Sequence, residues 1–283
     1  MNRLETKDKL AYCLLVSACQ SERRLDRRWL RAQVMDRPYD DSLLAPFCPL
    51  GRTERIRRAA RARQAGIQAV CIGDQDYPVR LAQANSCPLV LYYRGQDAVT
   101  RWNHPFAVTV IGSRSPSAYG QAVTRRIVAE LAARDTLVIS GLARGIDGLA
   151  HQVALDNGGL TIAVVAQGPD LVYPPEHAGL TARIARQGVV LSEHPPGTQP
   201  RRPHFPARNR LLSGLADVVA VMEARPKSGT LITAGFAADQ GREVLAVPGS
   251  ILGGDSGGCH LLLREGAGLI ESAADILALR RQT

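Results

Sequence analysis

Short apolar runs alternate with helix-length amphipathic segments from Phe106 onward, and this pattern constrains the fold more than any other feature of the chain. Runs that are apolar on both faces suit buried parallel strands. The alternation predicts an α/β fold, a doubly wound and mostly parallel sheet of six or seven strands. The predicted strands are Ala107–Ile111, Leu137–Ile139, Thr161–Ala166, Val189–Leu191, Val218–Met222 and Val244–Val247. The predicted helices lie near Gly120–Arg134, Gly148–Asp156, Ala178–Arg186, Phe205–Gly214 and Leu231–Gln240.

The first 104 residues carry most of the excess positive charge. They hold 18 Arg and Lys against 11 Asp and Glu, a net of +7, whereas the remaining residues hold 17 against 15, a net of +2. Helix-like segments at Lys9–Cys19, Asp26–Val34 and Thr53–Gln64 precede short strands near 66–72 and 87–93. We therefore predict two domains, a small basic helical domain with its linker at residues 1–104 and the α/β domain at residues 105–283.

Arginines form two runs in this basic part of the chain. Such a run is either a solvated helical face or an auxiliary surface that attracts phosphates, and the sequence leaves both readings open. The runs are Arg23, Arg24, Arg27, Arg28 and Arg31, followed by Arg52, Arg55, Arg57, Arg58, Arg61 and Arg63.

Cysteine usage and the first helix favour a cytoplasmic protein. The six cysteines form no CxxC pair, so we expect neither a disulfide framework nor a metal site. Val16–Cys19 resembles a lipoprotein cleavage box, but the apolar stretch before it is short and Glu5 and Asp8 are acidic, which favours an amphipathic helix. No apolar run reaches the ~18 residues that a membrane span needs, so we expect no membrane partner.

Loops rich in Gly, Ser and Arg follow several predicted strands. Ligands of doubly wound sheets bind beyond the carboxyl ends of the strands. Helix N-termini offer unpaired N–H groups to anions there. A further basic cluster at 201–210 enters a predicted helix, so the sequence predicts a phosphate site between these segments. The candidate residues are Gly112, Ser113, Arg114, Ser140, Gly141, Arg144, Arg208, Arg210, Lys227, Ser228, Gly229 and Thr230.

Familiar nucleotide-binding motifs are absent from these loops. Neither GxxxxGK[ST] nor GxGxxG occurs in the sequence, so we expect no ATP or NAD cofactor. Arg114 stands where a dinucleotide fingerprint has its second glycine. There it would obstruct a pyrophosphate but could hold an isolated phosphodiester. The pattern therefore favours an isolated phosphodiester over a pyrophosphate as the ligand.

Several long segments occur in a distinctive order. They are VIGSRSPSAYG at 110–120, ISGLARGIDGLAHQVAL at 139–155, VYPPEHAGL at 172–180, the basic stretch at 191–234 and GREVLAVPGS at 241–250. In them the chain resembles the DNA-processing protein A family (DprA, also called Smf). The resemblance implies an extended Rossmann-like sheet preceded by a helical, SAM-like domain. It also implies a DNA pocket built from Gly112, Ser113 and Arg114 together with Lys227, Ser228 and Gly229. Thr230 stands where Ser is commoner in the family, which keeps a hydroxyl there.

The same resemblance implies a function. Members of this family bind single-stranded DNA, protect incoming DNA and load the RecA recombinase during natural transformation, without being enzymes. They pair as homodimers through the Rossmann-like domain, and the apolar C-terminal stretch from Leu261 to Leu279 agrees with such a contact. Many carry a C-terminal winged helix, whereas this chain stops at Thr283, so we expect a short form without that module.

Two other functions suit this type of sheet. One is a nucleotide phosphoribohydrolase of the lysine-decarboxylase-like group, and the other is a nucleotide-sensing module without a DNA role. The hydrolase pattern GGxGTxxE needs a carboxylate soon after Gly229–Thr230, but Leu231, Ile232 and Thr233 follow. We expect Asp147 and His151 to form a local structural pair, and Glu223 to hold Arg225 or a loop amide. We therefore predict no catalytic residue.

Overall fold

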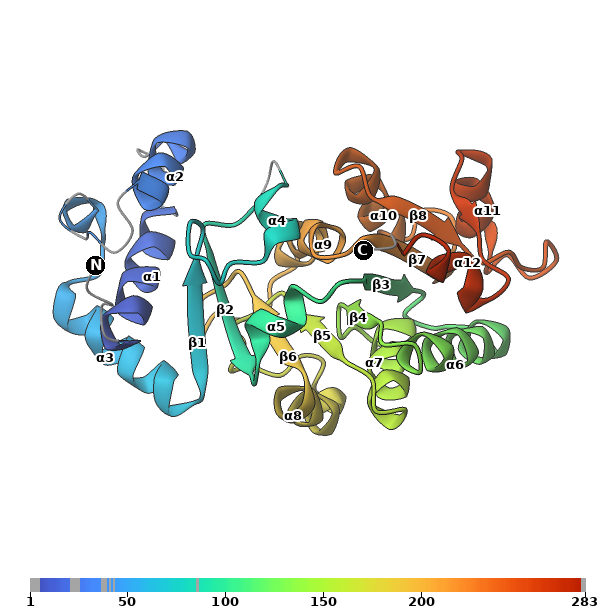
Figure 1. Cartoon of the computed structure of the whole chain (residues 1–283), viewed down its shortest axis with the longest axis horizontal. Coiled ribbons are helices and arrows are strands. Elements are labelled where there is room, and N and C mark those ends of the chain that lie inside the picture. Colours follow the sequence, from blue (N-terminus) through green and yellow to red (C-terminus); the bar gives the residue numbers. More distant parts are fainter. Residues whose placement is uncertain are drawn as a thin grey trace.

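A single sheet of nine strands runs through the computed structural model (Figure 1). The structure describes residues 6–20, 26–36, 40, 42, 44–84 and 87–280. Arg23 and Arg24 of the first arginine run lie outside them. The strands are β1 (Ile67–Cys71), β2 (Val90–Gly95), β3 (Ala107–Gly112), β4 (Leu137–Ser140), β5 (Thr161–Val164), β6 (Val189–Ser192), β7 (Val218–Glu223), β8 (Glu243–Ala246) and β9 (Gly268–Leu269).

Helices cover both faces of this sheet, and the first three stand at the end beside β1 (Figure 1). No helix among the described residues is long and apolar enough to cross a membrane. The helices are α1 (Thr6–Gln20), α2 (Arg27–Asp36), α3 (Arg52–Gln64), α4 (Val79–Ala82), α5 (Ala98–Trp102), α6 (Ala118–Ala132), α7 (Ile146–Asp156), α8 (Ala178–Gln187), α9 (His204–Gly214), α10 (Gly229–Asp239), α11 (Gly257–Arg264) and α12 (Ala273–Leu277), with short 3-10 turns at Ala45–Phe47 and Pro175–His177.

The strand order confirms the predicted doubly wound, mostly parallel sheet. The order is β1-β2-β6-β5-β4-β3-β7-β8-β9, and the pairs from β6 through β9 are all parallel. The chain winds outward from β3 to β6 and then returns to build β7, β8 and β9 on the other side of β3. The carboxyl end of β3 therefore lies at the topological switch point, where such sheets bind their ligands.

The predicted α/β part contributes seven strands, β3 to β9, within the predicted six or seven, but the sheet has nine because it also takes in strands from the basic N-terminal part. β1 and β2 form an antiparallel hairpin, and β2 pairs antiparallel with β6. Without this pairing β6 would present a row of unpaired N–H and C=O groups, which the hairpin satisfies. The two parts of the chain differ in charge composition, but their strands pair with each other in one sheet. The domain boundary near residue 104 remains a prediction, and strands from both sides of it share one sheet.

Buried side chains fasten the N-terminal helices to the sheet. Tyr92 of β2 is fully buried, and its hydroxyl donates to the carbonyl oxygen of Cys13 at 2.9 Å and bonds to the hydroxyl of Ser17 at 2.8 Å. Leu15 and Cys19 of α1 are also fully buried. The segment that resembles a cleavage box therefore forms part of a packed helix, as the amphipathic pattern predicts. The free energy of burying these apolar groups, about 25 cal/mol per Å², fixes α1 against β1 and β2.

Candidate nucleic-acid interface

Three segments from distant parts of the chain surround a cleft of about 540 Å³ at the switch point. One is the turn after β3, which carries Gly112, Ser113 and Arg114. The second is the loop from Arg225 to Thr230, between β7 and α10. The third is the first half of α9, with Phe205, Arg208 and Asn209. The cleft therefore lies where the carboxyl ends of the parallel strands predict a ligand.

The turn after β3 is held between two neighbours by backbone hydrogen bonds. The N–H of Ser113 donates to the carbonyl of Glu223 at 2.8 Å, and the N–H of Ile146 donates to the carbonyl of Ser113 at 3.0 Å. Gly145 has a φ of +76°, and a Cβ there would lie 2.2 Å from the Ser113 oxygen. Only glycine permits both that backbone conformation and this close approach. The position of Arg114 is thus fixed by β7 and by the start of α7.

The loop before α10 presents Lys227 on a strained backbone. Lys227 has a φ of +65°, which costs a non-glycine residue of the order of 1 kcal/mol. Ser228 caps α10 by accepting the N–H of Thr230 at 3.2 Å, and the Thr230 hydroxyl donates to the carbonyl of Gly112 at 3.2 Å. The two hydroxyls therefore join this loop to the turn after β3. Lys227 itself is exposed at the edge of the cleft.

Two cations at this cleft have no acidic partner among the described residues. Within the part of the chain that the structure describes, neither Arg114 nor Lys227 takes part in an ion pair. Arg225, by contrast, pairs with Asp255 at 2.6 Å. The guanidinium carbon of Arg114 lies 5.7 Å from the centre of the Phe205 ring, and Phe205 also contacts the ring of Tyr173 at 5.6 Å. The cleft thus offers positive charge for phosphates and one aromatic ring, that of Phe205, on which a base can stack.

Arg208 forms the floor of the cleft rather than its edge. It is 5% exposed, and its guanidinium donates to the carbonyl of Gly141 at 2.7 Å and to the carbonyl of Val164. Burial lowers the pKa of Arg208 to about 10, while the nearby charge of Asp147 opposes that effect. Asp147 is buried too, and burial raises its pKa although it accepts the N–H of Gly141 at 3.1 Å. Arg208 therefore remains charged at neutral pH and joins α9 to the carboxyl ends of two strands, β4 and β5.

The structure brings most of the candidate residues to one place. Ser140 and Gly141 lie behind the cleft, because the Ser140 hydroxyl is buried and donates to the carbonyl of Val110 at 2.6 Å. The role of all twelve residues in binding stays a prediction. The candidates that line the cleft are Gly112, Ser113, Arg114, Arg208, Lys227, Ser228, Gly229 and Thr230.

Two of the predicted arginines lie away from the cleft. Arg144 is exposed and pairs with Glu176. Arg210 pairs with Glu193 at 2.6 Å and lines a separate hollow next to Cys87. Both arginines form ion pairs with carboxylates that are distant in sequence.

Phe205, Asn209 and Asp147 are among the residues that line the cleft but were not predicted as candidates from the sequence. Phe205 lies inside the basic cluster at 201–210, and its position one residue before Pro206 in that cluster was the available signal.

The carboxylates considered for catalysis have structural partners. Glu223 is 1% exposed and accepts the N–H of Ser117 at 3.0 Å as well as the Ser117 hydroxyl, so it holds a loop amide as expected. It does not line the cleft. The expected pair between Asp147 and His151 does not form, because the His151 ring bonds to the hydroxyl of Thr161 at 2.7 Å. Burial lowers the pKa of His151 to about 3. Among the described residues, no cluster of His, Cys, Asp or Glu could hold a metal ion.

Comparison with known proteins shows the family to which the chain is similar. The sequence model described as DNA recombination-mediator protein A matches residues 68–281. The DNA processing protein DprA of Bacillus subtilis is 40% identical over 220 residues, which cover 78% of this chain and 73% of that protein. The DprA of Streptococcus pneumoniae is 44% identical over 205 residues, which cover 72% of this chain and 71% of that protein.

Solved structures extend the comparison to the fold. The X-ray structure of DNA processing protein A from Streptococcus pneumoniae superposes with a TM-score of 0.79 at 35% identity and covers 98% of both chains. The protein from Helicobacter pylori, whose structure was reported for its single-stranded DNA binding mode, gives a TM-score of 0.67 at 28% identity. It covers 76% of this chain and 96% of that one. The chain thus belongs to the family of DNA recombination-mediator protein A, the DprA and Smf proteins.

Proposed function

We propose that this chain binds single-stranded DNA in the cleft at the switch point, as a binding protein rather than an enzyme. The observation that carries the proposal is that Arg114 and Lys227 line the cleft together with Phe205 and form no ion pair with any residue that the structure describes. Arginine and lysine side chains neutralise phosphates, and aromatic rings stack on bases without sequence preference. The Helicobacter pylori relative and its single-stranded DNA binding mode support the same ligand.

The biological part of the proposal follows from family membership. We infer that the protein acts in the cytoplasm, where it protects incoming single-stranded DNA and passes it to the RecA recombinase during natural transformation. The family description of a recombination mediator supports this role. The phosphoribohydrolase alternative is less well supported, because Glu223 is buried away from the cleft and bonded to Ser117.

The binding of DNA should depend strongly on salt. If about four phosphates are neutralised, the logarithm of the affinity for single-stranded DNA falls with the logarithm of salt concentration at a slope near −3, about −0.7 per phosphate. Fluorescence anisotropy with a single strand, its duplex and a mononucleotide, each at several salt concentrations, measures this slope. We expect the single strand to bind most tightly. Affinity that does not change with salt, or a duplex that binds equally well, would contradict the proposal.

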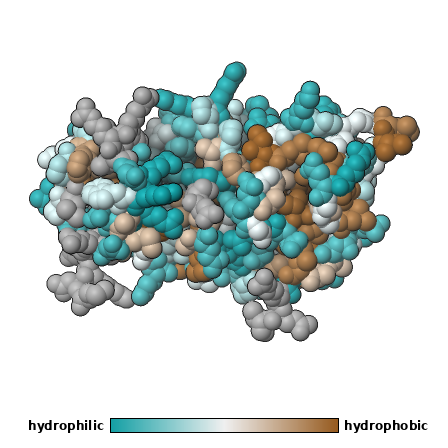
Figure 2. Space-filling view, turned by 90° about the horizontal axis from the view of Figure 1, so that it is seen from above, coloured by the Kyte–Doolittle hydropathy of each residue, from teal (hydrophilic) through white to brown (hydrophobic). Residues whose placement is uncertain are grey.

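We also propose a homodimer formed through the sheet domain. Hydrophobic side chains gather over the part of the molecule that carries α10 and α11 (Figure 2). Ile251 and Leu252 are 86% and 92% exposed, and Leu269 is 46% exposed. The C-terminal apolar stretch contributes less than expected, because Ile270 and Ile276 are fully buried inside the chain. An exposed apolar patch of this kind is typical of a protein interface.

Replacing Ile251 and Leu252 with aspartate is expected to convert the dimer into a monomer, because two buried charges would be left without partners at the contact. Light scattering at micromolar concentration measures the mass relative to the 30.5 kDa chain. Ile56→Asp serves as the control, since Ile56 is 51% exposed on α3, at the opposite end of the sheet. A wild-type protein that is monomeric in this measurement would refute the dimer and leave the cleft proposal unaffected.

A further inference from the structure

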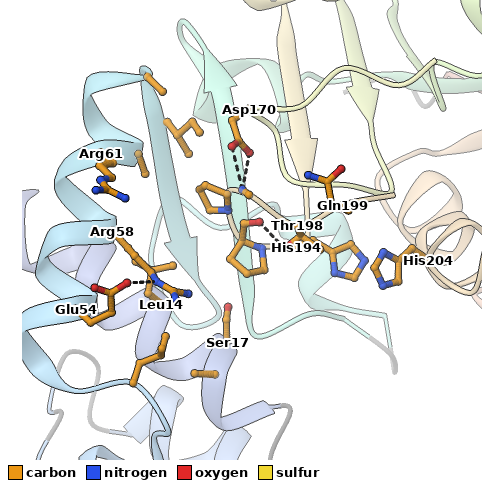
Figure 3. A pocket seen from close by; sticks show the side chains of 18 of the residues that line it. Leu14, Ser17, Glu54, Arg58, Arg61, Asp170, His194, Thr198, Gln199 and His204 are labelled. Carbon is orange, nitrogen blue, oxygen red and sulfur yellow. Dashed lines mark hydrogen bonds and ion pairs between the residues drawn. The ribbon is translucent and has the colours of Figure 1, made fainter. Parts of the chain in front are cut away.

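A second hollow, of about 990 Å³, lies between the N-terminal helices and the loop that follows β6. We call it the groove. Figure 3 shows Arg58 and Arg61 of α3 on one side, and His194, Gln199 and His204 on the other. Arg201 also lines it. None of the candidate residues predicted from the sequence lies here, so the cleft at the switch point does not account for this feature.

The groove carries a surplus of positive charge. Both of its carboxylates have other partners: Asp170 accepts the N–H of Gly197 at 2.9 Å, and Glu54 pairs with Arg57 and Arg58 on its own helix. Arg61 and Arg201 are exposed, and neither takes part in an ion pair within the described ranges. Two guanidinium groups are therefore available to an anion that enters the groove.

The face of α3 explains why only some of its arginines reach the groove. Arg58, Arg61, Ala62 and Ala65 all line the groove. They are three or four residues apart, a spacing that places side chains on one side of a helix. Arg55 instead is buried and donates to the carbonyl of Leu50 at 2.8 Å. Arg57 is exposed and does not line the groove. The arginines of this run therefore have different roles. Arg55 bonds to the backbone, Arg57 is exposed to solvent, and Arg58 and Arg61 face the groove.

Consecutive residues of the chain line the groove and the cleft. His204, the first residue of α9, lines the groove, and the next residue, Phe205, lines the cleft. The rings of His204 and His194 stack with centres 4.1 Å apart, and the Nδ1 of His204 bonds to the carbonyl of Ala166 at 3.1 Å. A strand that passed from the cleft to the groove at this point would run beside the stacked rings of His194 and His204 toward Arg61 and Arg201.

From this arrangement we propose that the groove binds further nucleotides of the same single strand, with phosphates at Arg61 and Arg201. The proposal rests on the proposed function of the cleft. It gives the N-terminal helices a role in holding DNA, because they supply one wall of the groove. It also predicts that affinity increases with strand length once the strand extends beyond the cleft.

The test compares two thymidine oligonucleotides with the full chain. One has about four nucleotides, near the lower limit for single-strand-binding folds, and the other about 20, which exceeds their usual site sizes. The double variant Arg61→Ala/Arg201→Ala should bind the long strand about 25-fold more weakly at about 0.1 M salt, from a factor of about five per lost phosphate contact. Its salt slope should be flatter by about 1.4. Its affinity for the short strand, measured by competition, should remain that of the wild type.

A matched control removes the same charge elsewhere. Arg57 and Arg126 are exposed, and each already pairs with a glutamate on its own helix. Arg57→Ala/Arg126→Ala should lose little affinity for either strand. The groove proposal is overturned if this control loses as much as the groove variant, if the groove variant binds the long strand like the wild type, or if it weakens both strands equally. Failure of the wild type to bind either strand would instead overturn the function proposed for the cleft.

Discussion

Replacement of both Arg114 and Lys227 by alanine is expected to lower the affinity for single-stranded DNA about 100-fold. Each side chain is exposed at the cleft and forms no ion pair with the residues that the structure describes, so each can donate a charge-assisted hydrogen bond to a phosphate. Such a bond contributes about 1.5 kcal/mol or more, which corresponds to at least about tenfold in affinity. The salt slope should become flatter by about 1.4, because two phosphates are no longer neutralised. Anisotropy titrations of the wild type and the variant measure both quantities.

The fold should survive these substitutions. Neither side chain is buried, and alanine at position 227 adopts the positive φ at no greater cost than lysine. The melting temperature should therefore stay within a few degrees of the wild type. Arg57→Ala is the control, since this exposed arginine of α3 lines neither the cleft nor the groove. An equal loss of affinity in that variant would mean that diffuse positive charge, rather than a cleft, attracts the DNA.

The strands from β3 to β8 could be predicted within about two residues, because each contains a short apolar run and those from β3 to β7 are buried on both faces. The position of the cleft followed from the same pattern, since the carboxyl ends of parallel strands meet at the switch point. The turn at Gly112–Arg114 and the loop at Lys227–Thr230 are 115 residues apart in sequence, and one sheet edge brings them together.

Other features depend on pairs of residues that a single sequence does not connect. The basic composition of the first part of the chain gave no sign that β2 would pair with the edge of β6. Arg210 was expected near the phosphate site, but Glu193, seventeen residues earlier, pairs with it. The same limitation applies to Arg144 and Glu176. Rules based on strand ends select the correct loops, yet they cannot tell which cations are free to bind a ligand.

Replacement of the buried Arg208 by methionine is expected to lower the free energy of unfolding by about 3–5 kcal/mol. The variant leaves Asp147 buried with its negative charge uncompensated, and it removes the donor to the carbonyls of Gly141 and Val164. Breaking a buried charge arrangement by removing one partner has a cost of this size. Arg202→Met is the control, because Arg202 is exposed on the loop before α9 and should change the stability by less than about 0.5 kcal/mol. Urea denaturation followed by circular dichroism measures both variants.

The pH dependence of the stability lost in Arg208→Met tests whether the buried charge of Asp147 is the cause. Burial already raises the pKa of Asp147 in the folded state, and loss of the Arg208 charge should raise it further. The folded state then binds a proton more readily than the unfolded state, so the variant gains relative stability as the pH falls below that raised pKa and loses it as the pH rises. We therefore expect a smaller difference from the wild type at pH 5 than at pH 8. Adding Asp147→Asn should restore part of the stability and remove this pH dependence. A loss that is equal at both pH values and unaffected by Asp147→Asn would assign the effect to packing around the methionine instead.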